Sequence, residues 1–234
     1  MEMLSQFPGG RVLDVATGQG GFVQFLAENL RDYAAIVGID TLTSGAAAFA
    51  EIAKDQPHVR LIQMDAHQMG LASASFDTVC ISNSLHHMSD LPRVLAEMQR
   101  VLKPGGHYIV AEMYRDGQTE TQLTHVLLHH WWAAVDTARG ITHYETYPRQ
   151  QILDLLDGLG LESLTVEDVR DLSGDPHDPD GIQYLEKVID RYLARAAGMP
   201  NQAALEQRGE ALRQRVRVIG VHGAASLLAV GRKP

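Results

Sequence analysis

The sequence predicts an α/β fold built on a doubly wound, mostly parallel sheet of seven strands. Three observations predict it: short apolar runs alternate with helical patterns in the first half, two further apolar runs follow in the second half, and helical patterns separate those last two. Strands that alternate with helices of about 10–15 residues indicate parallel βαβ units with right-handed crossovers. A closed barrel of eight strands is excluded, because too little chain remains after the fifth predicted strand.

The first half supplies five of these strands. They are predicted at residues 11–16, 35–39, 59–64, 77–82 and 107–113. The first ends abruptly at a glycine-rich turn, TGQGG, which a helical pattern follows. A second helix is expected over residues 44–54, opened by Ser44. An amphipathic helix over 91–102 ends at Lys103-Pro104-Gly105-Gly106, the turn that we expect before the fifth strand.

The second half is richer in helices. Helices are predicted at residues 119–139, 149–159, 182–197 and 202–215, and strands at 163–169 and 224–230. Residues 174–181, GDPHDPDG, are rich in Pro, Gly and Asp and predict a surface loop. We therefore expect a single domain over 1–234, with a helical insertion at about 175–217 between the last two strands.

Composition narrows the class of protein. The 234 residues include 20 Lys and Arg against 29 Asp and Glu, a net charge of −9, which argues against binding to nucleic acid through phosphate neutralisation. The single cysteine, Cys80, rules out a disulfide framework and a zinc site built from cysteines. There is no apolar stretch long enough to span a membrane, and the first ten residues do not resemble a signal peptide. We expect a cytoplasmic protein.

The predicted strand ends point to a nucleoside site. Open α/β sheets bind ligands at the carboxyl ends of their strands. The first of these ends has the spacing D-x-A-x-G-x-G from Asp14 to Gly20, and glycines there allow a ligand to approach the backbone closely. Asp40 follows Gly20 by 20 residues, the spacing at which an acid reaches ribose hydroxyls in dinucleotide-binding folds.

Five segments together resemble the class I S-adenosylmethionine-dependent methyltransferases, in particular the type 11 group that includes quinone-pathway C-methyltransferases. These segments are VLDVATGQGG, GID, MDAHQM, FDTVCISNSLHHM and VLKPGG, in that family's order, within residues 12–106. The resemblance implies a Rossmann-like fold, a cofactor-binding half at 1–115 and a substrate-side half at 116–234. It also implies that the cofactor is S-adenosyl-L-methionine, with S-adenosyl-L-homocysteine as product.

The resemblance assigns cofactor contacts residue by residue. The first motif would surround the methionine moiety, Asp40 would hold the ribose hydroxyls, and Asp65 would lie near the adenine amino group. The full set is Asp14, Ala16, Thr17, Gly18, Gly20, Asp40, Thr41, Leu42, Asp65, Ala66, Ser82 and Asn83. Two departures stand out: Ala16 occupies a position where many members have glycine, and only about ten residues precede the first strand. Either the N-terminus is truncated here, or other segments would cover the pocket. A second copy could also cover it, so both a monomer and a homodimer stay open.

Methyl transfer from a sulfonium is a direct displacement, so the protein mainly aligns the reactants and excludes water. A general base assists some acceptors. His86 and His87 are the candidates for that role, although the pair also fits simple packing at a helix start, and the catalytic residues therefore stay unknown.

Acceptor contacts are expected at the end of the fifth strand and in the second half. The candidates are Glu112, Tyr114, Arg115, His129, Trp132 and Tyr144. His125, His129, Trp132 and Asp136 share one helix stripe, for which we favour a polar lining or a solvated face over a metal site. An arginine cluster, Arg208, Arg213, Arg215 and Arg217, is interpreted as a solvated helix face.

We therefore expect methyl transfer to a small-molecule acceptor that the sequence does not identify. A non-catalytic methyltransferase-like binding module is the alternative. A nicotinamide oxidoreductase fits Asp40 but not the later segments. We expect neither a metal nor a nucleic-acid partner.

Overall fold

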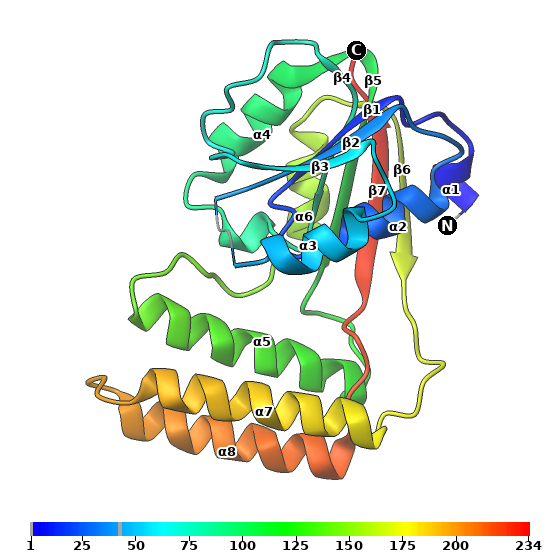
Figure 1. Ribbon diagram of the computed structural model, residues 1–234. Coiled ribbons are helices and arrows are strands. Elements are labelled where there is room, and N and C mark those ends of the chain that lie inside the picture. The colour runs from blue at the N-terminus through cyan, green and yellow to red at the C-terminus, as the bar shows by residue number, and fades with distance from the viewer. Residues whose placement is uncertain (1, 42–43) are drawn as a thin grey trace. The chain divides into compact units, whose positions relative to one another are not determined.

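The chain is described by a computed structural model that covers residues 2–41 and 44–234 (Figure 1). In this described part, seven strands form one sheet in the order β3-β2-β1-β4-β5-β7-β6. The strands are β1 (Arg11–Val15), β2 (Ala35–Asp40), β3 (Val59–Gln63), β4 (Phe76–Ser82), β5 (Leu102–Met113), β6 (Glu162–Val169) and β7 (Ser226–Arg232). The predicted number of strands and the α/β class are confirmed.

The sheet is mostly parallel, as predicted. β1 pairs in parallel with β2 and β4, β2 with β3, and β4 with β5. β7 runs antiparallel to β5, because the start of β5 bonds the residue after β7 (Gly105 N–H to the Lys233 carbonyl) and its end bonds the residue before it (Tyr114 N–H to the Ala225 carbonyl). The chain winds outward from β1 to β3 and then returns to β4 on the other side of β1. This reversal places a topological switch point at the carboxyl ends of β1 and β4.

The helices follow the predicted alternation. They are α1 (Glu2–Ser5), α2 (Gly21–Asn29), α3 (Ala46–Ala53), α4 (Leu91–Val101), α5 (Glu120–Ala138), α6 (Arg149–Asp157), α7 (Pro179–Ala196) and α8 (Gln202–Ile219), with a short 3₁₀ turn at Leu85–His87. The predicted helical insertion between the last two strands is confirmed, since α7 and α8 lie between β6 and β7 in the chain. No helix in the described residues is long and apolar enough to cross a membrane.

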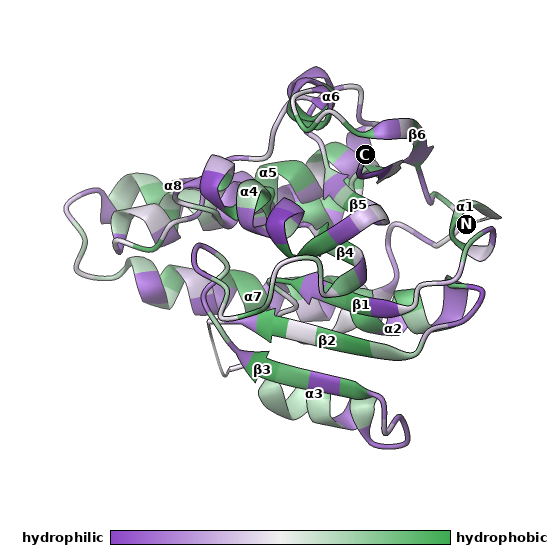
Figure 2. Ribbon diagram, turned by 90° about the horizontal axis from the view of Figure 1, so that it is seen from above, coloured by the Kyte–Doolittle hydropathy of each residue, from purple (hydrophilic) through white to green (hydrophobic). Residues whose placement is uncertain are grey.

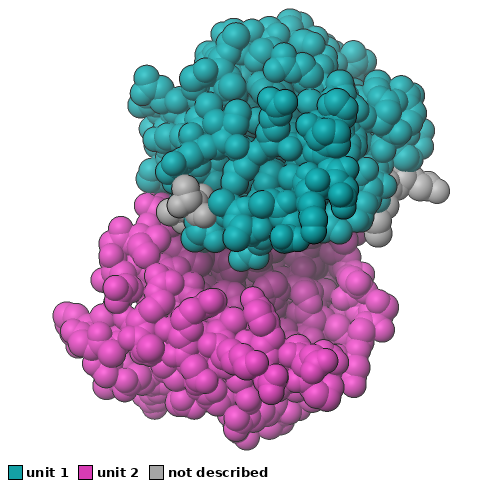
Figure 3. Space-filling view, viewed as in Figure 1, with its two compact units in different colours: residues 1–112, 153–167, 228–234 teal, residues 113–152, 168–227 magenta. Residues whose placement is uncertain are grey.

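The described chain divides into two compact units, which Figure 3 colours separately. The first comprises the described residues up to Glu112 together with 153–167 and 228–234, and the second comprises 113–152 and 168–227. Each unit is assembled from segments that are distant in the sequence. Neither is therefore a continuous half of the chain.

The core of the first unit forms around its central strands. β1 and β4 are buried along almost their whole lengths, as expected for parallel strands covered on both faces. Figure 2 shows the corresponding run of hydrophobic residues along β1 and β2. Val23 and Leu26 of α2 and Phe49 of α3 are almost completely buried in the same apolar cluster. The burial of these strands fixes where their carboxyl ends emerge.

The second unit has its own core, in which α5, α7 and α8 lie side by side (Figure 1). Trp131 of α5 is completely buried at its centre and donates its indole N–H to the Leu205 carbonyl at 2.9 Å. Gly209 of α8 lies against this indole, and a Cβ at position 209 would overlap the Trp131 ring. The Trp131 ring therefore fits only because position 209 of the facing helix carries no side chain.

Three local expectations were wrong at their boundaries. The second helix begins at Ala46 behind Gly45 and not at Ser44. The predicted loop 174–181 contains the first turns of α7, whose N-cap is Asp178, the acceptor of the Gly181 N–H at 2.8 Å. Residues 103–106 lie inside β5 as an irregularity of the ladder, since Leu102 pairs with Phe76 and His107 with Thr78.

Gly209→Ala is expected to destabilise the protein by about 2–3 kcal/mol, because the added methyl overpacks the Trp131 pocket. Helix propensity alone predicts the opposite sign, a gain of up to about 1 kcal/mol. Chemical denaturation measures the difference. Gly223→Ala in the same unit is the matched control, since no described atom lies within 4 Å of the position that its Cβ would occupy. An unchanged or higher stability of Gly209→Ala would contradict this packing.

Candidate functional site

The loop between β1 and α2 turns through left-handed backbone. Ala16 has φ 56°, Gly18 53° and Gly20 90°, after which α2 begins without a side-chain cap. An uncapped helix start directs its first N–H groups towards any ligand bound there. A left-handed alanine costs roughly 1–2 kcal/mol, which explains physically why glycine suits position 16.

The end of β2 is tied directly to this loop. Asp40 accepts the Gly18 N–H at 2.9 Å through Oδ2, and the Thr17 N–H donates to the Ile39 carbonyl at 3.0 Å. Thr41 is exposed, and Leu42 lies outside the described residues. The structure thus brings together the predicted ends of the first and second strands.

The end of β4 reaches the same loop from the other side. Ser84 Oγ lies 3.4 Å from the Ala16 carbonyl and 2.7 Å from the Ser82 carbonyl, to which it donates more closely. Asn83 has φ 45° and donates its N–H to the Ala111 carbonyl at 2.8 Å. Ser82 and Asn83 therefore lie beside the first loop at the switch point between β1 and β4.

Asp65 has a different environment from the other acids of the predicted set. It is exposed and accepts both the backbone N–H of His67, at 2.9 Å, and the His67 ring Nδ1, at 2.7 Å. These hydrogen bonds lower the pKa of the Asp65 carboxyl. Ala66, next to it, is buried. The Asp65 carboxylate thus caps its own loop and stays ionised.

Asp14 is the most unusual group of the loop. Its side chain is 1% exposed; Oδ1 lies 3.5 Å from the Cys80 thiol, and Oδ2 has no hydrogen-bond partner among the described residues. Burial raises the pKa of Asp14 to about 7, although the neighbouring Thr17 and Cys80 side chains act to lower it. The buried Thr17 hydroxyl has no hydrogen-bond partner of standard geometry in the same part of the chain either. Two polar atoms at the base of the loop therefore lack the partners that buried groups normally have.

His86 and Glu112 form a second buried polar group in the first unit. Both side chains are completely buried, and His86 Nδ1 lies 2.6 Å from Glu112 Oε1. The other carboxylate oxygen accepts the N–H groups of Ser84 at 3.0 Å and Leu85 at 3.1 Å. Glu112 thus fixes both the imidazole and the turn that carries it. His87, by contrast, is exposed and makes a tilted ring contact with His86.

The other predicted acceptor contacts belong to the second unit. Tyr114 is buried and accepts a hydrogen bond from Arg170, and Arg115 pairs with Glu145 at 3.4 Å. His129 and Trp132 make an edge contact at 5.8 Å between ring centroids. Tyr144 is 49% exposed.

One cluster of polar side chains in the second unit was not predicted from the sequence. Asp136 accepts the His143 ring nitrogen at 2.8 Å and the Tyr192 hydroxyl at 3.1 Å, and Arg195 lies 2.6 Å from its other oxygen. Asp136 was visible as part of the helix stripe, but its partners come from a loop and from α7, which no local pattern connects to it. Three of the clustered arginines, Arg213, Arg215 and Arg217, pair with carboxylates, and their side chains are 14%, 23% and 52% exposed, respectively.

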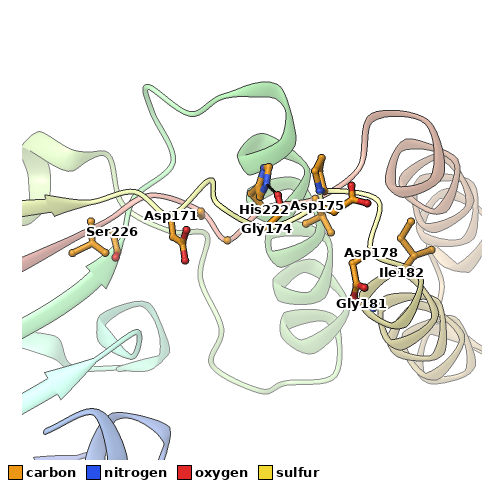
Figure 4. Close-up of a pocket in the computed structure, with 13 residues that line it drawn as sticks. Asp171, Gly174, Asp175, Asp178, Gly181, Ile182, His222 and Ser226 are labelled. Carbon is orange, nitrogen blue, oxygen red and sulfur yellow. Dashed lines mark hydrogen bonds between the residues drawn. The ribbon is translucent and has the colours of Figure 1, made fainter. Parts of the chain in front are cut away.

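A pocket of about 400 Å³ in the second unit contains none of the predicted site residues (Figure 4). Three aspartates line it, but each has a local structural role. Asp171 accepts from Ser173, Asp175 from the His177 N–H, and Asp178 caps α7. His222 donates to or accepts from Thr121 and lies 3.0 Å from the Gly174 carbonyl. The three aspartates of this pocket therefore serve to hold the loop and the start of α7 in place.

Comparison with known proteins gives a consistent result. A methyltransferase domain model, of type 11, matches residues 13–110. The methyltransferase GfsG of Streptomyces halstedii is 30% identical over 175 residues, which cover 72% of this chain and 58% of that protein. The ubiquinone/menaquinone biosynthesis C-methyltransferase UbiE of Geobacter sulfurreducens is 35% identical over 107 residues, covering 44% of this chain and 42% of that protein.

A solved structure extends the likeness in fold to the whole chain. The Haemonchus contortus phosphoethanolamine N-methyltransferase 2, in complex with phosphomonomethylethanolamine and S-adenosylhomocysteine, superposes with a TM-score of 0.59 at 18% identity. It covers 100% of this chain, which matches 51% of that one. The chain spans less than two thirds of the length of the curated relatives it matches.

Asp14→Asn is expected to stabilise the ligand-free protein increasingly as pH rises. The folded-state pKa of Asp14, about 7, lies above its ordinary value of 3.8, so native Asp14 favours the protonated form and the wild type loses stability as pH rises through 7. The gain of the variant should grow by roughly 2–3 kcal/mol between pH 5 and pH 8.

Denaturation midpoints at several pH values measure this effect. Asp65→Asn is the control, because the pKa of that exposed acid is lowered and its removal should give no such gain. A stability difference for Asp14→Asn that does not change with pH would show that Asp14 is not protonated in the folded protein.

Proposed function

We propose that the chain is a methyltransferase of the type 11 family and that it transfers the methyl group of S-adenosyl-L-methionine to a small-molecule acceptor. The observation that carries the cofactor assignment is the base of the β1–α2 loop, where Oδ2 of the buried Asp14 has no hydrogen-bond partner of standard geometry in the described chain. A ligand that presents an ammonium group at this loop would satisfy it. The relative from Haemonchus contortus with the same fold was solved with S-adenosylhomocysteine bound.

Asp40 would hold the ribose. A carboxylate offers about four lone-pair positions, and the Gly18 N–H uses one of those of Asp40. The bond from Gly18 orients the Asp40 carboxylate and holds the β1–α2 loop against it. The proposed subsites for the ribose and for the methionine moiety would therefore keep a constant distance from each other. Thr41, Leu42, Asp65 and Ala66 would surround the adenine, and Ser82 and Asn83 the methionine end.

S-adenosyl-L-methionine supplies an activated methyl group when bound, and the protein's share is alignment and exclusion of water. The left-handed turn at Ala16, Gly18 and Gly20 keeps side chains out of the path of the ligand. The switch point between β1 and β4 is where a ligand of such a sheet would bind.

We further propose that His86 is the general base. Nδ1 lies against Glu112, so Nε2 is the nitrogen that would take the proton of the acceptor. Glu112 acts through His86 and is a positioning residue, a role that its three hydrogen-bonding neighbours support better than acceptor contact. A fixed base suits an acceptor that must lose a proton, such as a carbon acid, and the relative from Geobacter sulfurreducens is named a C-methyltransferase. Tyr114, Arg115, His129, Trp132 and Tyr144 remain proposed contacts of the acceptor.

S-adenosylhomocysteine should raise the melting temperature of the purified protein, and Asp40→Ala should reduce that rise strongly by removing the ribose acceptor and the Gly18 tie. A loss of at least tenfold in affinity is expected, which calorimetry measures. Asp55→Ala, a surface acid of the same unit, is the control. No melting shift with saturating S-adenosylmethionine and S-adenosylhomocysteine would refute the proposed cofactor.

His86→Ala should lower the rate of methyl transfer about 10²–10⁴-fold, and Glu112→Gln should lower it about 10-fold or more. The affinity of both variants for S-adenosylhomocysteine should change little. The assay follows an isotope-labelled methyl group from S-adenosylmethionine into a panel of acceptors that includes an acetoacetyl thioester, a phenol and a primary amine. Preserved circular dichroism and cofactor binding show that the variants fold. Wild-type rates in His86→Ala would exclude His86 as base, and binding without transfer to any acceptor would favour a binding module.

A further inference from the structure

Three polar side chains of the first unit, carried by two separate loops, form a chain of hydrogen bonds. Asp65 and His67 lie on the loop after β3, and Ser89 lies on the turn before α4. Asp65 Oδ1 lies 2.7 Å from His67 Nδ1, and Ser89 Oγ lies 3.2 Å from His67 Nε2. The carboxylate, the imidazole and the hydroxyl are thus connected in the order of an acid–histidine–serine catalytic triad.

A backbone contact indicates which nitrogen of His67 carries the proton. The N–H group of Asp90, which can only donate, is directed at His67 Nε2 at 3.4 Å. Nε2 is therefore the acceptor nitrogen of the neutral ring, and Nδ1 carries the proton and donates it to Asp65. The Ser89 hydroxyl in turn donates to Nε2. The basic lone pair of His67 faces the hydroxyl, as activation of a serine nucleophile requires.

The base is held in place by the chain, whereas the hydroxyl is open to solvent. Asp65 also accepts the backbone N–H of His67 at 2.9 Å, and Arg93 of α4 donates its Nε–H to the His67 carbonyl at 2.7 Å. The His67 side chain is 25% exposed, and Ser89 is an exposed residue. A small molecule from solvent can therefore reach Ser89 while His67 keeps its orientation.

We propose that Ser89 is a nucleophile in acyl transfer, with His67 as its general base and Asp65 as the positioning residue, and that the protein hydrolyses small carboxylic esters. This activity goes beyond the proposed methyl transfer and requires no cofactor. The hydrogen bonds from His67 lower the pKa of the Asp65 carboxyl, so the group that orients the imidazole stays ionised.

The reaction has two balanced steps. In the first, Ser89 Oγ forms a bond to the carbonyl carbon of the ester, and its proton passes to His67 Nε2. The bond between that carbon and the leaving oxygen then breaks, and His67 returns the proton to the departing alcohol. In the second step, water attacks the acylated Ser89, gives one proton to His67 and releases the carboxylic acid, while that proton restores the serine hydroxyl.

A fluorophosphonate, which reacts with activated serine hydroxyls, is the probe for Ser89. Incubated with the whole purified protein in the absence of S-adenosylmethionine, it should attach at Ser89 with loss of fluoride, as peptide mass spectrometry detects. The wild type should also hydrolyse p-nitrophenyl acetate, measured by the absorbance of p-nitrophenol. Ser89→Ala should lose the label and at least about 10²-fold of this rate. Ser73→Ala is the matched control, because Ser73 is an exposed serine of the same unit whose hydroxyl accepts from Arg100.

Two further variants test the partners of Ser89. His67→Gln should lower ester hydrolysis about 10²-fold or more, because the base is removed. Asp65→Asn should lower it about 10-fold or more, because an amide does not hold the ring in the same tautomer. Asp65 is also a proposed contact of the adenine, so this effect is measured on ester hydrolysis without cofactor. Ser89→Ala should bind S-adenosylhomocysteine with wild-type affinity, which shows that it folds.

The outcomes keep this proposal separate from the methyl transfer. Absence of the label from Ser89 in the wild type would overturn the proposal, and this measurement does not depend on the folding of any variant. If Ser89→Ala hydrolyses the ester at the wild-type rate and His67→Gln does not, the imidazole itself attacks the ester and Ser89 is not the nucleophile. A protein that is labelled at Ser89 but does not bind S-adenosylhomocysteine would contradict the proposed cofactor alone.

Discussion

The close contact between the β1–α2 loop and the end of β2 is the constraint on which the candidate site depends. It is held by two backbone N–H groups, of Gly18 to Asp40 and of Thr17 to the Ile39 carbonyl. The contact is possible because Gly38 has no side chain, since a Cβ there would meet Thr17 at 2.8 Å. Any residue larger than glycine at position 38 would push the loop away, and the acid of β2 would then lose its fixed distance from the turn.

The two buried carboxylates of the first unit show how differently a fold can treat the same chemical group. Glu112 has three hydrogen-bonding neighbours that satisfy both of its oxygens, so the chain itself provides all the partners that this side chain needs. Asp14 is as deeply buried, but one oxygen lacks a partner among the residues that the structure describes. This contrast supports the proposed roles, in which Glu112 positions its neighbours and Asp14 contacts the ligand.

Much of the fold followed from local patterns, because alternating apolar runs and polar strand ends report burial directly. The seven strands, the insertion of α7 and α8, and the meeting of the first, second and fourth strand ends were all predictable in this way. Contacts between distant segments were not. Ser44 looked like a helix cap, whereas the helix begins behind Gly45, and the partners of Asp136 come from a loop and another helix. The pairing of His86 with Glu112 likewise needs β4 and β5 to be adjacent.

The antiparallel strand β7 has a consequence for how the protein is made. It completes the sheet beside β5, and Lys233 exchanges backbone hydrogen bonds with Gly105 and Gly106. During synthesis on the ribosome, β5 emerges more than 110 residues before its partner. Until then one edge of β5 lacks its backbone partners and requires protection against pairing with other chains. Emergence of β7 is thus the event that closes this edge of the sheet.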